Sequence, residues 1–210
     1  MKGKEGMGVG ERADRLPVVV GMSGATGAIY GIRTLEVLRE LGVETHLVVS
    51  RWADATIPIE TSYRPADVRA LADHVHDEDD LTSRLADPAF ATAGMVVAPC
   101  SMRTLAAIAN GVCENLLQRA AEIHLQERRR LTLLVRESPL SVIHLDNMLR
   151  VAKAGAIVAP LVPALYARPR SLDEMVDHTV GRVLDQLGVE HERIRRWGER
   201  RHPALRPVDS

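Results

Sequence analysis

Five short apolar runs alternate along the chain with longer segments in which apolar residues recur every three or four positions. The runs cover residues 17–21, 45–50, 94–98, 131–135 and 156–159, and such near-continuous hydrophobicity is typical of strands buried on both faces of a sheet. The helical pattern covers residues 28–41, 102–109, 116–129, 145–154 and 172–187. Strands that alternate with helices predict an α/β fold of three layers around a doubly wound, mostly parallel sheet.

The last helical segment has the clearest pattern. Its apolar positions form one stripe from Leu172 to Leu187, as in a helix that buries one face. Ser171 and Glu174 stand three residues apart at its start, which predicts a capping box, and Gly188 follows its end.

Length and composition indicate one domain with two tails. The chain has 210 residues, of which 46% are hydrophobic and only 3% aromatic, so we expect a single core of aliphatic side chains. Residues 1–16 are rich in glycine and charge, and we expect them to be disordered. The α/β domain then covers residues 17–189, and residues 190–210 form a basic C-terminal arm.

Charge and hydropathy argue against several partners and locations. The formal net charge is −1, which gives no basis for binding nucleic acid or an anionic membrane. No stretch approaches the roughly 20 apolar residues that span a bilayer, and the N-terminus lacks the apolar segment of a signal peptide. Two cysteines are too few for a disulfide framework. We therefore expect a cytoplasmic protein.

Four segments that follow predicted strands should meet at one edge of the sheet. They are residues 21–31 (GMSGATGAIYG), 50–52 (SRW), 98–104 (APCSMRT) and 136–139 (RESP). In a doubly wound sheet, ligands bind at the carboxyl ends of the strands, near the point where the strand order reverses. These segments therefore form the candidate ligand site.

The first of these segments has the features of an anion-binding backbone. Gly24, Ala25 and Thr26 expose N–H groups at the start of a helix, and Ser23 and Thr26 add hydroxyl groups. The glycine spacing matches neither the G-x-G-x-x-G fingerprint nor a Walker loop. From this pattern alone, a phosphate contact and a plain tight turn both remain open.

The segment after the third strand repeats this arrangement. Ser101 can cap the next helix, and Arg103 and Thr104 lie in its first turn, where N–H groups are free; ordinary helix capping is the alternative. Local spacing places no histidine to activate Cys100, so we expect an inert buried thiol there.

Several cations near the expected site favour an anionic ligand. Arg136 directly follows a buried strand with Glu137 beside it, and Arg182 lies at the border of the last apolar stripe. Tyr166 adds a phenol in the segment YARPR. Guanidinium groups that converge on a pocket bind phosphate or carboxylate through paired hydrogen bonds.

No metal site is expected. The one dense group of metal-ligand residue types is His74 and His76, followed by the acidic residues 77–80. We interpret this polar stretch as a solvated loop, and the segment HLDN at 144–147 as the start of a helix.

Three long segments resemble the UbiX-type flavin prenyltransferases, a group within the homo-oligomeric flavodoxin-like flavoproteins. The similar segments are 21–50, which begins GMSGATG, 96–160, which contains APCSMRT and VRESP, and 163–189, which contains LYARPRS. The resemblance implies a Rossmann-like or flavodoxin-like fold and a flavin-binding domain over residues 17–189.

The resemblance also implies a reaction. Enzymes of this family join the dimethylallyl group of dimethylallyl phosphate to reduced FMN, first at N5 and then at C6, without a metal ion. The product, prenylated FMN, is the cofactor of UbiD-type decarboxylases. The family assembles as a homododecamer whose active sites lie where subunits meet.

By position, the resemblance assigns three groups of residues. The flavin contacts are Gly24, Ala25, Thr26, Ser50, Ser101, Met102, Arg103, Thr104 and Arg136. The catalytic groups are Thr26, Glu60 and Glu137, and the contacts to the substrate phosphate are Arg119, Gln126, Tyr166 and Arg182. Thr26 stands where the family commonly has serine, and Gln126 stands where it typically has lysine.

Three functions are compatible with these residues. The favoured one is a flavin prenyltransferase. The second is a related flavin-dependent enzyme of the cysteine-type decarboxylases, which act on a carboxylate that bears a thiol. The third is an FMN-binding accessory subunit of a decarboxylase that performs no prenyl transfer, and Gln126 is the residue that favours it.

Overall fold

Within residues 15–192, six parallel strands form one sheet in the order β3-β2-β1-β4-β5-β6. Their bounds are β1 Val18–Met22, β2 Thr45–Val49, β3 His74–His76, β4 Gly94–Cys100, β5 Leu131–Val135 and β6 Ile157–Val158. The computed structural model describes residues 15–192. Residues 1–14 of the expected tail and 193–210 of the expected arm lie outside the described residues.

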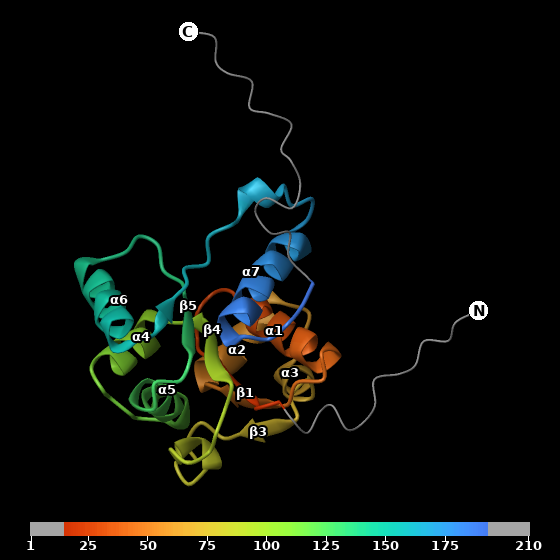
Figure 1. Cartoon of the computed structure of the whole chain (residues 1–210). Helices are drawn as coiled ribbons and strands as arrows, with labels where there is room; N and C mark the ends of the chain where they lie inside the picture. The colour runs from red at the N-terminus through yellow and green to blue at the C-terminus, as the bar shows by residue number, and fades with distance from the viewer. Residues whose placement is uncertain (1–14, 193–210) are drawn as a thin grey trace.

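Helices cover both faces of the sheet (Figure 1). One face carries α1 (Ala28–Glu40), α2 (Arg51–Glu60), α3 (Pro65–Arg69) and α7 (Leu172–Leu187), and the other carries α4 (Met102–Ala109), α5 (Leu116–Gln126) and α6 (Val142–Ala154). Two short 3₁₀ helices, η1 (Arg84–Ala86) and η2 (Leu165–Ala167), lie in the connections. The predicted three-layer, doubly wound α/β fold is therefore confirmed, with a sheet that is parallel throughout.

The core is aliphatic and lies in two layers, one on each face of the sheet. Every residue of β1, β2, β4 and β5 is buried, which explains why these strands form continuous apolar runs in the sequence. Within residues 15–192, no helix has the length and the apolar character needed to cross a membrane.

Two helix boundaries differ from the predicted ones for local reasons. Helix α5 ends at Gln126 instead of residue 129, and Arg128 then adopts a left-handed conformation with φ of 57°. Helix α6 begins at Val142 instead of residue 145, because the Ser141 hydroxyl accepts a hydrogen bond from the N–H of His144. The N-cap Ser141 thus starts the helix three residues before its apolar pattern begins.

The predicted capping box at the start of α7 is only half formed. The Ser171 hydroxyl accepts a hydrogen bond from the N–H of Glu174, as expected. The Glu174 carboxylate, however, accepts from the N–H and the guanidinium of Arg170 instead of from Ser171. Leu172 is exposed, so the buried stripe of α7 begins at Val176.

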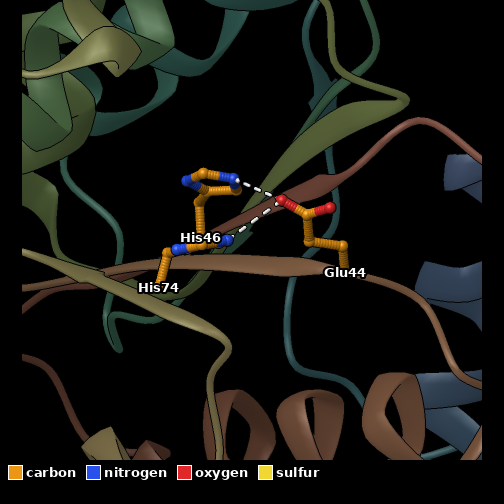
Figure 2. Close-up of side chains that lie close together, drawn as sticks. All are labelled: Glu44, His46 and His74. Carbon is orange, nitrogen blue, oxygen red and sulfur yellow. Dashed lines mark hydrogen bonds and ion pairs between the residues drawn. The ribbon is translucent and has the colours of Figure 1, made fainter. Parts of the chain in front are cut away.

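Strand β3 stands where the sequence indicates a solvated loop. Its residues pair in register with His46, Leu47 and Val48 of β2, which makes β3 the edge strand of the sheet. The expectation of exposure is correct for His74, but the expectation of a loop is wrong. The ring of His74 lies beside His46 and close to Glu44 (Figure 2).

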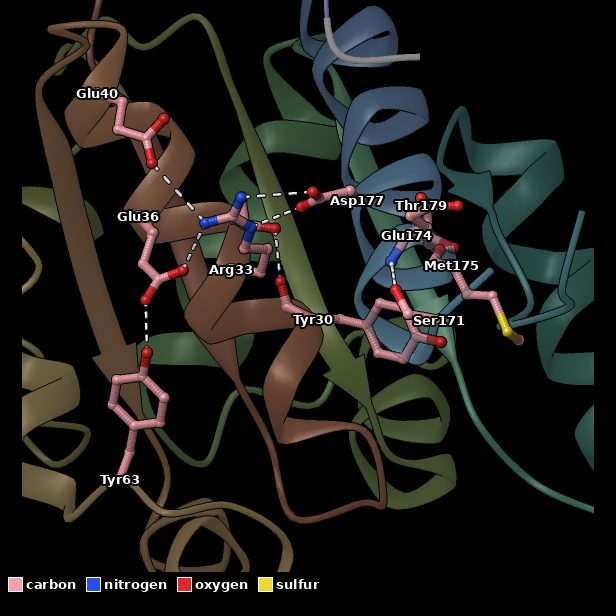
Figure 3. Close-up of polar contacts among 11 residues, drawn as sticks. Tyr30, Arg33, Glu36, Glu40, Tyr63, Ser171, Glu174, Met175, Asp177 and Thr179 are labelled. Atoms are coloured by element: carbon pink, nitrogen blue, oxygen red, sulfur yellow. Dashed lines mark hydrogen bonds and ion pairs between the residues drawn. The ribbon is translucent and has the colours of Figure 1, made fainter. Parts of the chain in front are cut away.

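Helix α7 is fixed on α1 by a charged network at the outer surface of these two helices (Figure 3). The guanidinium of Arg33 on α1 donates to Asp177 on α7 over 2.6 Å and to Glu36 over 2.9 Å. Tyr63 donates its hydroxyl proton to the same Glu36 carboxylate. The hydrogen bond to Asp177 raises the pKa of Arg33 above its usual range. The network thereby sets the position of α7 and of the side chains that it carries.

Helix α1 approaches strand β4 closely at Gly31. A Cβ atom at this position would collide with the carbonyl oxygen of Ala98 and would press against the side chain of Met22. Glycine is therefore required here for close contact between helix and sheet.

Candidate functional site

A cavity of about 440 Å³ lies at the carboxyl ends of β1, β2 and β4. The chain runs outward from β1 to β2 and β3 and then returns to β4 on the other side of β1, so the strand order reverses beside this cavity. Its lining includes six of the predicted flavin contacts, namely Gly24, Ser50, Ser101, Met102, Arg103 and Thr104, and also Glu137. The volume is in the range of small-molecule sites.

The loop after β1 is tied to the loop after β4. The hydroxyl of Ser23 donates to the carbonyl of Pro99 over 3.0 Å and accepts from the N–H of Ser101 over 2.8 Å. Gly24 lies directly against Trp52 at the start of α2, where a Cβ atom would collide with the tryptophan. The predicted first loop is therefore held between β4 and α2, and this close approach requires its glycine.

Glu60 lies at the N-terminus of α1. Its Oε2 atom accepts hydrogen bonds from the N–H groups of Gly27 and Ala28, over 2.8 and 3.1 Å. Gly27 is the N-cap residue and has a φ of 112°, a conformation that favours glycine. The predicted catalytic carboxylate thus sits beside the loop of Ala25 and Thr26 and closes the N-terminus of the helix that follows it. Thr26 itself is exposed.

A second carboxylate, that of Glu78, accepts a hydrogen bond at the N-terminus of α2. Its Oε1 atom accepts from the N–H of Arg51 over 2.6 Å, while Oε2 accepts from the side-chain amide of Asn115. The predicted flavin contact Ser50 is the N-cap of α2 and accepts from the N–H of Ala53. Glu78 and Asn115 both line the cavity, and neither was among the predicted site residues. Glu78 follows strand β3, which was not predicted, and Asn115 is the N-cap residue of α5.

The N-terminus of α4 remains open toward the cavity. Ser101 caps this helix by accepting from the N–H of Thr104, as predicted, while its hydroxyl donates to the Thr104 hydroxyl oxygen. Within residues 15–192, the N–H groups of Met102 and Arg103 have no hydrogen-bond partner. These two N–H groups, the free proton of the Thr104 hydroxyl and the positive end of the helix dipole suit a phosphate.

The side chain of Arg103 reaches Glu114, with 3.1 Å between its Nη2 atom and the carboxylate oxygen. Both side chains are more than half exposed, so the pair contributes little to stability. Arg103 is therefore able to turn toward an anion at the start of α4.

Cys100 is completely buried at the end of β4. Burial raises the pKa of its thiol to about 12. The thiolate is the reactive form of cysteine, so the expectation of an inert thiol agrees with this environment.

Arg136 and Glu137 follow β5 beside the cavity. The N–H of Arg136 donates to the carbonyl of Cys100, which places both residues at the same edge of the sheet as Ser101. Both are exposed. The Glu137 carboxylate accepts from the N–H of Ser138, and no ion pair joins it to Arg136 within the described part of the chain. Glu137 therefore does not hold the guanidinium of Arg136 in this arrangement.

The four predicted contacts to the substrate phosphate lie on opposite faces of the sheet. Tyr166 and Arg182 line a second cavity of about 330 Å³ beside α7. The Tyr166 hydroxyl lies 3.3 Å from the Nε2 atom of His178, and Arg182 forms an ion pair with Asp185.

Arg119 and Gln126 are carried by α5, on the other face. The guanidinium of Arg119 donates to Glu122 over 2.6 Å, and Gln126 is exposed at the last position of the helix. One chain therefore does not bring the two pairs of predicted phosphate contacts together. Their assignment stays a prediction, as do the roles of the other site residues.

The chain matches a known protein family and known relatives over most of its length. Residues 9–184 match the flavoprotein family model. A probable UbiX-like flavin prenyltransferase from Bacillus subtilis is 52% identical over 183 residues, which cover 87% of this chain and 90% of the relative.

Two solved structures have the same fold. The crystal structure of AnUbiX (PadA1) in complex with FMN and dimethylallyl pyrophosphate has a TM-score of 0.84 and 51% identity, and it matches 87% of this chain and 99% of its own. A dodecameric FMN-dependent UbiX-like decarboxylase from Escherichia coli O157:H7 has the same TM-score and coverage at 49% identity. The resemblance read from the sequence is therefore confirmed: the chain belongs to the UbiX-like flavin prenyltransferases of the flavoprotein family.

Proposed function

We propose that this protein is a flavin prenyltransferase that joins the dimethylallyl group of dimethylallyl phosphate to reduced FMN. The observation that carries the proposal is the open N-terminus of α4, where Met102 and Arg103 offer free N–H groups to a cavity at the reversal of strand order. FMN carries a phosphate that this position suits. Bound reduced FMN would supply the nucleophilic atoms, N5 and then C6.

The chain's own residues have three tasks in this reaction. Gly24, Ala25 and Thr26 would hold the flavin against the loop after β1, and Glu60 keeps that loop in place through the start of α1. Glu60 or Glu137 would accept a proton beside the flavin.

The third task is to hold the departing phosphate. Tyr166 and Arg182 would bind it from one side, and Arg119 and Gln126 from the other. Charge develops on the phosphate oxygens as the allylic bond breaks, and one preorganised donor contributes roughly 3–4 kcal/mol in comparable sites.

The separation of these residues supports assembly into a homo-oligomer, for which we propose a dodecamer. Because the two pairs lie on opposite faces of one chain, residues of different subunits would complete each phosphate site. Helix α6 leaves a row of apolar side chains exposed for such contacts, namely Val142, Ile143, Leu145 and Leu149. One solved relative is dodecameric.

The wider setting is part of the same proposal. Residues 17–189 form the flavin-binding domain, and prenylated FMN passes to a decarboxylase of the UbiD type. We place the reaction in the cytoplasm, which is consistent with the two free thiols, Cys100 and Cys113.

The test uses the purified full-length chain with FMN, a reductant and dimethylallyl phosphate under anaerobic conditions. Mass spectrometry of the released flavin should show an addition of one prenyl unit. Unmodified flavin with both dimethylallyl phosphate and the pyrophosphate would overturn prenyl transfer. Loss of FMN binding in an Arg103→Ala variant, relative to an Arg64→Ala control outside the cavity, would locate the flavin at α4.

A second candidate is an FMN-binding accessory subunit, favoured by the uncharged Gln126 in the predicted phosphate set. It predicts FMN binding without a change in flavin mass, and a Gln126→Lys variant that gains prenyl transfer. A third outcome, release of CO₂ from a peptide that ends in cysteine, would indicate a cysteine-type decarboxylase instead.

A further inference from the structure

A histidine-rich cluster lies at the β2–β3 edge of the sheet (Figure 2). It lies near the amino ends of these two strands, whereas the flavin cavity lies at their carboxyl ends. Glu44 precedes β2, His46 lies within it, and His74 is the residue of β3 that pairs with His46. Residues 44 and 46 point to one face, because side chains alternate along a strand. The rings of His46 and His74 stack with their centres 4.6 Å apart.

The ligand atoms of this cluster already have the spacing of a metal site. The Oε1 atom of Glu44 lies 3.2 Å from Nε2 of His46 and 3.1 Å from Nε2 of His74. All three ligand atoms lie within 4.8 Å of one another. Tetrahedral zinc, with bonds of about 2.0–2.1 Å, separates neighbouring ligand atoms by about 3.3 Å. The two oxygen–nitrogen distances fit this spacing, and an ion requires the stacked imidazole rings to turn so that both Nε2 atoms face one point.

Further groups orient the buried histidine, as is usual for metal ligands. The Nδ1 atom of His46 lies 2.8 Å from Nε2 of His76, whose Nδ1 lies 2.7 Å from the hydroxyl of Ser83. When His46 donates to His76 and His76 donates to Ser83, the Nε2 atom of His46 carries a free lone pair directed at Glu44. The Ser83 hydroxyl can also donate, so the same chain is satisfied in the opposite sense without an ion.

Burial differs between the two sides of the cluster. His46 is completely buried and meets the edge of the Phe90 ring, with the ring centres 5.0 Å apart. The side chains of His74 and Glu44 are about half exposed, at 50% and 45%. One ligand is thus fixed by packing, while the other two leave an entry path and room for a fourth ligand from solvent.

We propose that Glu44, His46 and His74 bind one divalent transition-metal ion, zinc in particular. Two imidazoles and one carboxylate form a donor set that zinc accepts with a water as the fourth ligand. The ion would join the three-residue edge strand β3 to β2. Glu78 follows β3 by two residues and holds the start of α2 at the flavin cavity, so the ion would stabilise that wall without taking part in prenyl transfer.

The experiment titrates the chelator-treated, tag-free full-length protein with ZnCl₂ by calorimetry and with CoCl₂ by visible absorption. We expect one ion per chain and the strong visible bands of tetrahedral Co²⁺. The variants Glu44→Gln and His74→Ala should each bind at least 10-fold more weakly. Both residues are partly exposed, so circular dichroism should confirm that the variants fold.

Matched controls keep the result specific to the cluster. Glu127→Gln and His144→Ala make similar changes at other partly or fully exposed positions and should bind zinc like the unmodified chain. The proposal is overturned if zinc does not bind stoichiometrically, or if Glu44→Gln and His74→Ala bind it as tightly as the controls. Zinc binding is measured without FMN, so this outcome is independent of the proposed prenyl transfer.

Discussion

Removing the carboxylate of Glu60 should weaken both the fold and flavin binding. In the structure, this side chain accepts hydrogen bonds from Gly27 and Ala28 at the start of α1, and the loop of Gly24–Thr26 precedes these residues directly. Glu60→Ala leaves two N–H groups at a helix N-terminus without their acceptor. Glu60→Gln keeps a carbonyl oxygen as acceptor but loses the negative charge.

The magnitude follows from these two hydrogen bonds. Loss of an N-cap acceptor costs about 1 kcal/mol, with a range of roughly 0.5–2, and loss of a charge beside the helix dipole costs about 0.3–1 kcal/mol. Because Glu60 is exposed, we expect about 1–2 kcal/mol for Glu60→Ala and about half of that for Glu60→Gln. For a chain of this size, about 1 kcal/mol lowers Tm by about 2–4 °C.

The assay combines thermal unfolding, FMN titration by fluorescence and single-turnover prenyl transfer. Glu127→Ala is the control, because Glu127 is exposed and its side chain has no hydrogen bond within the described residues. Prenyl transfer that falls in Glu60→Gln far more than its small losses of Tm and FMN affinity explain would assign proton transfer to the carboxylate. An unchanged Tm in Glu60→Ala would refute the capping role.

Three further predictions concern buried or partly buried residues. Gly31→Ala should destabilise the fold by about 1–3 kcal/mol in urea unfolding, because the added methyl group would collide with the carbonyl of Ala98. Stabilisation, which the same change gives in a solvent-exposed helix, would contradict this contact. Burial lowers the pKa of His124 to about 4. The neutral ring therefore contributes at most about 3 kcal/mol to the free energy of unfolding; this contribution is complete above about pH 6.5 and is lost as the pH falls toward 4. His124→Gln should flatten the dependence of the unfolding free energy on pH in this window. Both cysteines should resist iodoacetamide at pH 8 until the protein unfolds, because the pKa is raised to about 12 for Cys100 and to about 11 for Cys113. Rapid alkylation of native Cys100, measured by mass spectrometry, would be inconsistent with its burial.

The elements that the sequence predicts well are those whose residues are buried along their whole length. The strands at 45–49 and 131–135 are buried along their whole length, so their apolar runs identify them without any tertiary information. Strand β3 has two histidines among its three residues and exists because β2 offers it a pairing edge. Helix α2 buries only Ala53 and Ile57 and contains Pro58, so it has no helical stripe to recognise.

The same difference decides which site residues could be found. Gly24 and Ser101 follow strands that the sequence predicts, and they line the cavity as expected. Glu78 follows the strand that was missed, so its contact with the start of α2 was invisible in the sequence. The zinc proposal has the same origin, because only the pairing of β3 with β2 brings His74 next to His46.

The N-termini of α1, α2 and α4 all lie at the carboxyl edge of the sheet, and their caps differ in charge. Glu60 closes α1 and Glu78 closes α2, each with a carboxylate on the first N–H groups. A bound phosphate at either of these positions would face a negative charge at close range, which is strongly unfavourable in a partly buried site. Helix α4 has only the neutral hydroxyl of Ser101 as its cap. We therefore expect an anion at α4 rather than at α1 or α2, with the flavin phosphate near Arg103 and the flavin ring near the loop after β1.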